Sequence, residues 1–152
     1  YRIDALFGHL PGRAAQALMK LGQRGQQTGV RVITENWFDT PSTSANVEHV
    51  LRPLAGSVGF LADTGNWSGD NKFSELAAIF RHAENCHAKA SFDAGDHMDE
   101  DDFARCLGAA AMAGYSGPYT LIYEGPGDEW QGLAREAAFI RRNFFEVPLM
   151  KI

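Results

Sequence analysis

Residues 58–66 read Val-Gly-Phe-Leu-Ala-Asp-Thr-Gly-Asn, an apolar run that stops at a carboxylate and a turn. A short apolar run bounded by turn residues is typical of a strand buried inside a parallel sheet. The same pattern recurs on both sides of this stretch, and a longer amphipathic segment separates each run from the next. The strand candidates are residues 3–7, 30–35, 58–62, 83–89 and 119–124. We therefore expect about five buried strands along the chain.

Apolar residues recur every three or four positions between the strand candidates, and this spacing predicts helices there. The first helix candidate is residues 13–28. The second is a stretch that Ser44 would cap and that ends between Pro53 and Gly56, and the third is residues 73–80. The fourth begins at Asp99 or Asp101 and ends at Gly114, and the last is residues 130–140. Strict alternation of about five strands and five helices predicts an α/β fold. Its parallel strands would be joined by right-handed helical crossovers.

Composition and charge exclude several classes of protein. The 152 residues carry 14 Lys and Arg against 19 Asp and Glu, and the net charge of −5 lacks the basic surface of a nucleic-acid binder. No apolar stretch approaches the roughly 18 residues of a membrane span. We therefore expect neither a nucleic-acid partner nor a membrane. Cys86 and Cys106 fall inside expected helices or strands and indicate buried thiols in a reducing compartment, which predicts a cytoplasmic protein.

Four successive strand candidates end in a side chain that can bind a metal ion. These residues are Glu35, Asp63, His87 and Glu124. In a parallel (β/α)₈ barrel the carboxyl ends of all strands lie on one rim, where the active site is built. Three carboxylates and one imidazole favour Mn²⁺, Mg²⁺ or Co²⁺, and Zn²⁺ is also compatible with them. No Gly-x-Gly-x-x-Gly turn and no P-loop follows any strand candidate, so a barrel rim matches better than a nucleotide-binding sheet.

The residues around these strand ends resemble one known superfamily. The stretches that carry the resemblance are Thr34-Glu35-Asn36, Leu61-Ala62-Asp63-Thr64-Gly65, His87-Ala88-Lys89, Gly114-Tyr115-Ser116-Gly117 and Tyr123-Glu124-Gly125. Their order and spacing look like the xylose isomerase-like TIM-barrel superfamily, and within it like the sugar phosphate isomerase/epimerase group. The resemblance implies one partial (β/α)₈ TIM-barrel domain over residues 1–152. It would hold about the last five βα units, from about strand 4 to helix 8.

A full barrel of this kind needs about 250 residues. The chain also begins at Tyr1 without a Met, which we interpret as a cut. We expect the first strands to come from a missing N-terminal half of the barrel or from a partner. A free half-barrel would have open sheet edges and would form a homo-oligomer.

The resemblance also implies a reaction. The four strand-end residues correspond to the family's metal ligands, and we expect them to hold one divalent ion. Mn²⁺ is the ion that we expect most. Glu35 and Glu124 would be the acid/base pair: one removes the proton next to the carbonyl of a small sugar-derived substrate, and the other returns it after an enediolate. This is the chemistry of a metal-dependent sugar (phosphate) isomerase or epimerase. The residues expected to contact the substrate are Asn66, Lys89, Trp37 and Trp67.

Two other functions stay open. Apurinic-site endonucleases of the same superfamily use an Asp-x-His pair in the region of His97. The charge of −5, the presence of Asn66 where relatives carry a histidine, and the lack of a multi-histidine zinc set oppose this reaction. We interpret His97 as part of a solvated acidic loop that precedes the helix near Asp99. A non-catalytic half-barrel subunit would bind metal poorly, because the ligands of an incomplete barrel lack the contacts that orient them.

Overall fold

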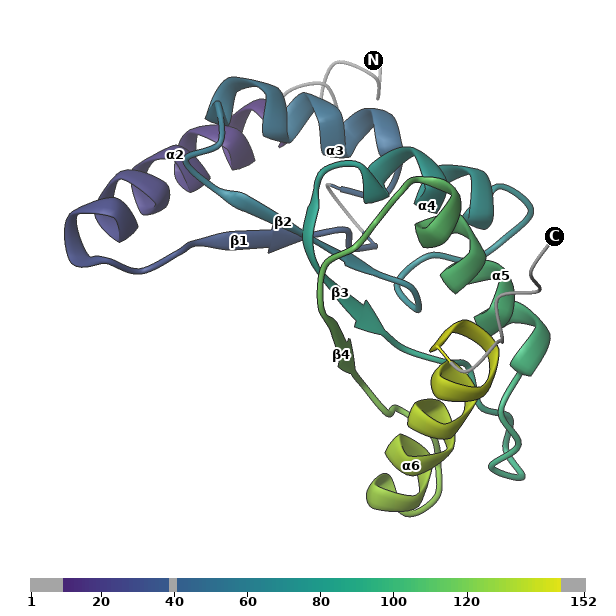
Figure 1. Cartoon of the computed structure of the whole chain (residues 1–152). Coiled ribbons are helices and arrows are strands. Elements are labelled where there is room, and N and C mark those ends of the chain that lie inside the picture. The colour runs from purple at the N-terminus through teal and green to yellow at the C-terminus, as the bar shows by residue number, and fades with distance from the viewer. Residues whose placement is uncertain (1–9, 39–40, 146–152) are drawn as a thin grey trace, which may run out of the picture.

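The structure, a computed structural model, describes residues 10–38 and 41–145 (Figure 1). Helices and strands alternate along this part of the chain. The strands are β1 (Ile33–Glu35), β2 (Gly59–Asp63), β3 (Ala83–Ala88) and β4 (Tyr119–Leu121). The helices are α2 (Leu10–Thr28), α3 (Ser44–Leu51), α4 (Lys72–Phe80), α5 (Glu100–Met112) and α6 (Glu129–Ile140), with a 3₁₀ turn at Arg52–Leu54 and a π-helical turn at Arg141–Phe145.

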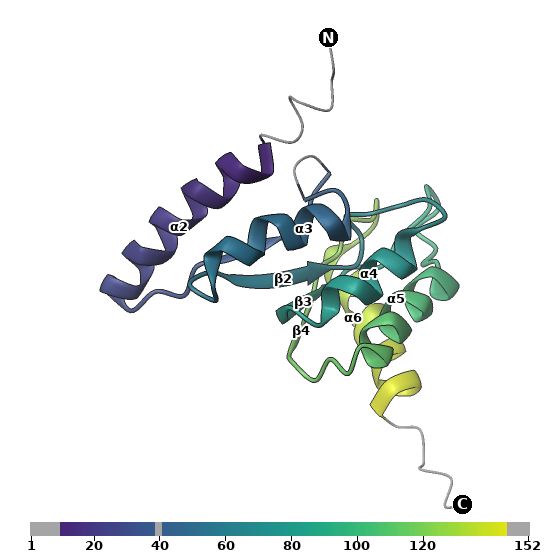
Figure 2. The same ribbon diagram turned by 90° about the horizontal axis from the view of Figure 1, so that it is seen from above.

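The four strands form one sheet in the order β1-β2-β3-β4, and every neighbouring pair is parallel. The register of β2 and β3 places Asp63 opposite His87 at the carboxyl edge. Helices α3, α4 and α5 pack side by side along one face of this sheet (Figures 1 and 2). The prediction of an α/β fold with parallel strands is confirmed, and the sheet is compatible with part of an α/β barrel.

The hydrophobic core lies between the sheet and this helix layer. Alternate side chains of the two central strands are buried there, Phe60 and Ala62 from β2 and Cys86 and Ala88 from β3. Because successive side chains of a strand point to opposite faces, the intervening side chains turn away from the helices. The expected metal ligands of these strands therefore lie on the face that the helix layer does not cover.

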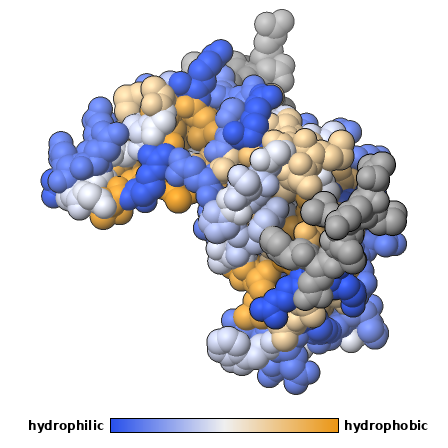
Figure 3. Space-filling view, in the orientation of Figure 1, coloured by the Kyte–Doolittle hydropathy of each residue, from blue (hydrophilic) through white to orange (hydrophobic). Residues whose placement is uncertain are grey.

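A second, smaller cluster holds α2 against the rest of the chain. Its buried members are Ala15, Val50, Leu54 and Val58. The arm formed by α2 and β1 also exposes Leu21, Val30 and Ile33, and apolar surface is visible on this arm in Figure 3. Among the described strands, β1 and β4 each pair on one side only, so both edges of the sheet are open. A homo-oligomer, or a missing half that covers these edges, stays a prediction.

Two features of the composition can be compared with the structure. Cys86 and Cys106 are free and buried, as the sequence predicts. Burial raises the pKa of the Cys106 thiol to about 12 and also raises the pKa of Cys86, so neither is a nucleophilic thiolate at neutral pH. Within the described ranges, none of the helices combines the length and the apolar character needed to cross a bilayer. A cytoplasmic location stays a prediction.

Both outer strands are shorter than the sequence predicts. The strand expected over residues 30–35 covers only Ile33–Glu35, and the one expected over residues 119–124 covers only Tyr119–Leu121. Each has a single described neighbour, so its hydrogen-bonded ladder ends where that one pairing ends. The strand expected over residues 3–7 lies outside the described residues.

The start of α3 corrects one expected helix cap. Thr43, not Ser44, is the N-cap, and its Oγ1 accepts a hydrogen bond from the Asn46 amide at 3.2 Å. The amide that Ser44 would have satisfied belongs to Val47, and it already donates to the Thr43 carbonyl at 3.0 Å as the first intrahelical bond. Ser44 is therefore the first residue of the helix rather than its cap.

Candidate metal centre

Three of the four expected ligands meet at the carboxyl edge of the sheet. Glu35 ends β1, Asp63 ends β2, and His87 lies next to the end of β3; we call these residues the triad. The Nδ1 atom of His87 is 3.4 Å from Oδ2 of Asp63 and 3.6 Å from Oε2 of Glu35. One ligand atom from each residue lies within 4.8 Å of the other two. Two carboxylates and an imidazole at this spacing can hold a divalent ion.

The triad is buried at Asp63 and open to solvent at Glu35 and His87. The side chain of Asp63 is 4% exposed, whereas those of Glu35 and His87 are 34% and 27% exposed. Burial, and after it the charge of Asp63, raises the pKa of Glu35, while the charges of His87 and Lys89 oppose that rise. Crowded carboxylates of this kind fit a bound cation, and the open side leaves space for a small molecule to reach it.

Asn36 holds Asp63 in place, and sequence reasoning missed this role. Asn36 is fully buried. Its Nδ2 donates to the Asp63 carbonyl at 2.9 Å, and its Oδ1 accepts from the Asp63 amide at 2.8 Å. The side chain thus makes the two bonds that another residue of β1 would make if the strand continued. The available signal was a polar residue directly after Glu35, with a side-chain amide that has both a donor and an acceptor.

Thr64 likewise extends the pairing of β2 with β3 through its side chain. Its Oγ1 donates to the Lys89 carbonyl at 2.9 Å and accepts from the Lys89 amide at 2.8 Å. Its own amide donates to the His87 carbonyl at 3.1 Å. The polar residues that directly follow Glu35 and Asp63 therefore extend the strand pairing beyond the ends of the ladders. This extension fixes the backbone that carries the ligands.

Lys89 places a cation beside the triad. Its side chain is 7% exposed, and its Nζ donates to Asn66 Oδ1 at 2.9 Å and lies 3.7 Å from Asp63 Oδ1. Gly65 makes room for it, because a Cβ at that position would lie 2.4 Å from Lys89 Cε. Asn66 is itself fully buried, and its Nδ2 donates to the Asn36 carbonyl at 2.9 Å. The side chain of Asn66 holds Lys89 in the structure, and its expected contact with a substrate stays a prediction.

Glu124, the fourth expected ligand, does not join the triad. It lies three residues beyond the end of β4. Its side chain is 66% exposed, and its Oε2 accepts a hydrogen bond from Lys89 Nζ at 3.1 Å. The structure therefore places Glu124 at the mouth of the site, on the Lys89 side.

The two tryptophans near the site have different surroundings. Trp67 is 7% exposed, packs in the core, and donates its Nε1–H to the Pro41 carbonyl at 3.2 Å. Most of the Trp67 side chain is therefore buried, and its contact with a substrate stays a prediction. Trp37 is 45% exposed and contacts Phe38 edge to face at 5.1 Å between ring centroids, so it remains open to a ligand.

Replacing Asn36 by leucine tests its structural role. We expect Asn36→Leu to lower the free energy of unfolding by about 2–4 kcal/mol, because a buried amide and a buried carbonyl of Asp63 lose their partners. Urea denaturation measures the change. Asn71→Leu is the matched control, since Asn71 is exposed and its side chain makes no capping bond, and we expect less than about 0.5 kcal/mol there. Equal effects in the two variants would contradict the role of Asn36.

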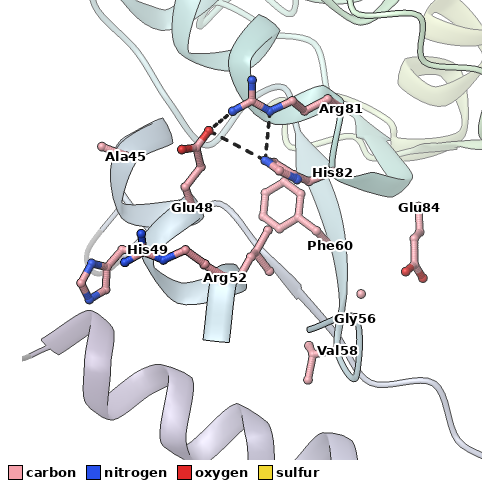
Figure 4. Close-up of a pocket in the computed structure, with 12 residues that line it drawn as sticks. Ala45, Glu48, His49, Arg52, Gly56, Val58, Phe60, Arg81, His82 and Glu84 are labelled. Atoms are coloured by element: carbon pink, nitrogen blue, oxygen red, sulfur yellow. Dashed lines mark hydrogen bonds and ion pairs between the residues drawn. The ribbon is translucent and has the colours of Figure 1, made fainter. Parts of the chain in front are cut away.

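A cavity of about 570 Å³ lies at the other end of the strands (Figure 4). Glu48 from α3 forms an ion pair there with Arg81, which follows α4, and His82 lies beside them. Phe60 and Glu84 line it near the points where β2 and β3 begin. Active sites of parallel α/β proteins lie at the carboxyl ends of the strands. We therefore assign the chemistry to the triad rather than to this cavity.

No family model matches the chain, and no curated protein sequence matches it.

Proposed function

We propose that the triad binds one divalent metal ion, with Mn²⁺ as the preferred ion. The protein would then be an isomerase or epimerase that acts on a sugar or a sugar phosphate. The observation that carries the proposal is the meeting of three nitrogen and oxygen ligands from the ends of three neighbouring parallel strands. Mg²⁺, Co²⁺ and Zn²⁺ are compatible with the same ligands. The buried Asp63 and the bonds from Asn36 support the centre, because ligands need fixed orientations to bind metal tightly.

The proposed architecture is part of a (β/α)₈ barrel with about the last five βα units. Its support is the parallel order of the four strands and the layer of helices on one face. The ligands lie at the carboxyl edge, where barrel enzymes carry their active sites. In this proposal the uncovered face of the sheet is the barrel interior, and further strands complete it.

The residues at the mouth of the site suit proton transfer next to a carbonyl. When bound, a divalent cation would stabilise the negative charge that develops on the substrate oxygens. Glu35 has a partly exposed carboxylate in the triad and would take the proton from the carbon next to the carbonyl. Glu124 approaches the mouth from β4 and would return the proton to that carbon. Lys89 would donate a hydrogen bond to a substrate hydroxyl and orient it.

Hydrogen exchange tests this reaction without knowledge of the natural sugar. We expect the Mn²⁺-loaded protein in D₂O to place deuterium on the carbon next to the carbonyl in at least one of a panel of ketoses and ketose phosphates, as measured by proton NMR. Glu35→Gln should lower the rate by at least about a hundredfold, because general-base catalysis contributes that much. Glu48→Gln is the matched control, since Glu48 pairs with Arg81 at the opposite end of the strands.

The outcome separates the reaction from the metal site. Exchange that persists in Glu35→Gln, or no exchange with any member of the panel although Mn²⁺ binds, would contradict the isomerase or epimerase proposal. The triad would then serve another metal-dependent reaction.

No observation in the described part of the chain favours the apurinic-site hydrolase. The side chain of His97 is 81% exposed and pairs with Asp93 at 3.1 Å on the loop before α5. It does not belong to the triad.

A further inference from the structure

Lys89 is held rigidly. Its aliphatic chain passes over Gly65 with no space for a further carbon, and its Nζ is anchored by Asn66 Oδ1 at 2.9 Å. Thr64 makes two hydrogen bonds to its backbone. The ammonium group therefore has a fixed position, 3.7 Å from the Oδ1 atom of Asp63.

The side chain of Glu124, in contrast, is not held rigidly. It lies beyond the end of β4, its side chain is two-thirds exposed, and it is joined to the site by an ion pair of 3.1 Å with Lys89. An exposed carboxylate on a long side chain can change rotamer at small cost. Of the two partners, Glu124 is the one that can move.

We propose that Lys89 is a built-in counter-ion that competes with the metal ion for Glu124. The inference rests on the proposed metal centre. Without metal, the Lys89 ammonium holds Glu124 away from the triad. When a divalent ion binds, Glu124 leaves Lys89 and becomes the fourth protein ligand, and Lys89 is then free to bond to a substrate oxygen.

The charges give the physical reason. The ammonium carries one positive charge close to Asp63 and Glu124, so it neutralises part of the carboxylate repulsion before metal enters. A divalent ion carries twice that charge and accepts direct coordination, so it attracts Glu124 more strongly than Lys89 does. The ion pair must break when the metal binds, and its loss lowers the metal affinity of the native chain.

A double-mutant cycle with Mn²⁺ alone tests the competition. The four proteins are the native chain, Lys89→Met, Glu124→Gln and the double variant, and isothermal titration calorimetry measures the dissociation constant for Mn²⁺. We expect Lys89→Met to bind Mn²⁺ at least about tenfold more tightly than the native chain. In the Glu124→Gln background the same change should help at least about threefold less, because no carboxylate is released.

Lys72→Met is the matched control. Among the residues that the structure describes, Lys72 is the other buried lysine, 6% exposed, and it pairs with Asp102 at 2.6 Å outside the triad. We expect its loss to change Mn²⁺ affinity by less than about twofold. Should Lys89→Met not fold, Lys89→Gln removes the charge while it keeps a polar contact with Asn66, and it takes the same place in the cycle.

Each result has a defined meaning. Weaker binding by Lys89→Met would overturn the competition and leave Lys89 as a support of the site. An equal gain in both backgrounds would also overturn it, since through-space repulsion without transfer of Glu124 predicts that result. If none of the four proteins binds Mn²⁺, the metal centre itself is wrong, whereas native binding without coupling removes the competition and leaves the proposed function standing.

Discussion

The free energy of unfolding of the native chain is expected to fall by about 3 kcal/mol as the pH rises from about 4.5 to about 7, because of Glu136. A Glu136→Gln variant should not show this fall. Glu136 lies on α6 and is fully buried. Its Oε1 accepts a hydrogen bond from the Ala90 amide at 3.0 Å, and its Oε2 has no hydrogen-bond partner among the described residues. Burial raises the pKa of this carboxyl group from 4.5 to about 7.

The sign follows from the direction of that pKa shift. Between pH 4.5 and about 7 the folded chain keeps the proton of Glu136, whereas the unfolded chain releases it. The folded state binds more protons in this range, so the free energy of unfolding falls as the pH rises. The contribution is complete below pH 4.5 and is lost as the pH passes the folded value of about 7. Glutamine cannot ionise, yet it still offers an oxygen to the Ala90 amide.

Urea denaturation at about pH 5 and about pH 8 measures the difference in both proteins. All other titratable groups are identical in the two chains, so their contributions to the pH dependence cancel in the comparison. Glu129→Gln is the control, because Glu129 is an exposed glutamate at the start of the same helix. Its pH dependence should match that of the native chain within about 0.5 kcal/mol. A Glu136→Gln variant with the native pH dependence would show that the carboxylate is accessible to water.

The second large effect is expected from His87→Ala, which should weaken Mn²⁺ binding at least about a hundredfold. The change removes the only nitrogen ligand of the triad and leaves two carboxylates. Loss of a residue that merely orients a ligand already costs about 10–100-fold, so loss of a ligand costs more. Asp63 would also lose the neighbour whose Nδ1 lies 3.4 Å from its Oδ2.

Calorimetric titration with Mn²⁺ measures the loss. His82→Ala is the matched control, since His82 is a half-buried histidine at the opposite end of the strands, beside Glu48. We expect its affinity to stay within about twofold of the native value. Comparable losses in the two variants would mean that Mn²⁺ binds elsewhere or that histidine removal weakens the fold.

Much of the fold could be read from the sequence because its signals are local. The run that ends at Asp63 has the apolar length of a buried strand, and it forms β2. Alternation with helices then makes the strands parallel, and parallel strands bring their carboxyl ends to one edge. Glu35, Asp63 and His87 could therefore be grouped before any contact was known.

The positions of other candidate residues depend on contacts between distant parts of the chain. The sequence around Trp67 has nothing to distinguish an aromatic ring at the mouth of a site from one buried under a loop. In the structure Trp67 packs in the core, and the carbonyl of Pro41, a residue 26 positions away in the sequence, accepts its N–H. Asn66 likewise bonds to Asn36 and Lys89 across three different strand ends. Hydrogen-bond partners that are distant in the sequence are defined only by the folded structure.

The order of the elements, the parallel sheet and the identity of the candidate ligands at the strand ends follow from periodicity and from the chemistry of single residues. The division of the four candidate ligands into a triad and a separate Glu124 does not. In the structure Glu124 lies beyond the end of β4 and pairs with the Lys89 ammonium, and Gly65 and Asn66 set the position of that ammonium through contacts just beyond the ends of β2 and β3. Backbone pattern is local along the chain, whereas electrostatic pairing depends on distances of a few ångströms that only the packed chain defines.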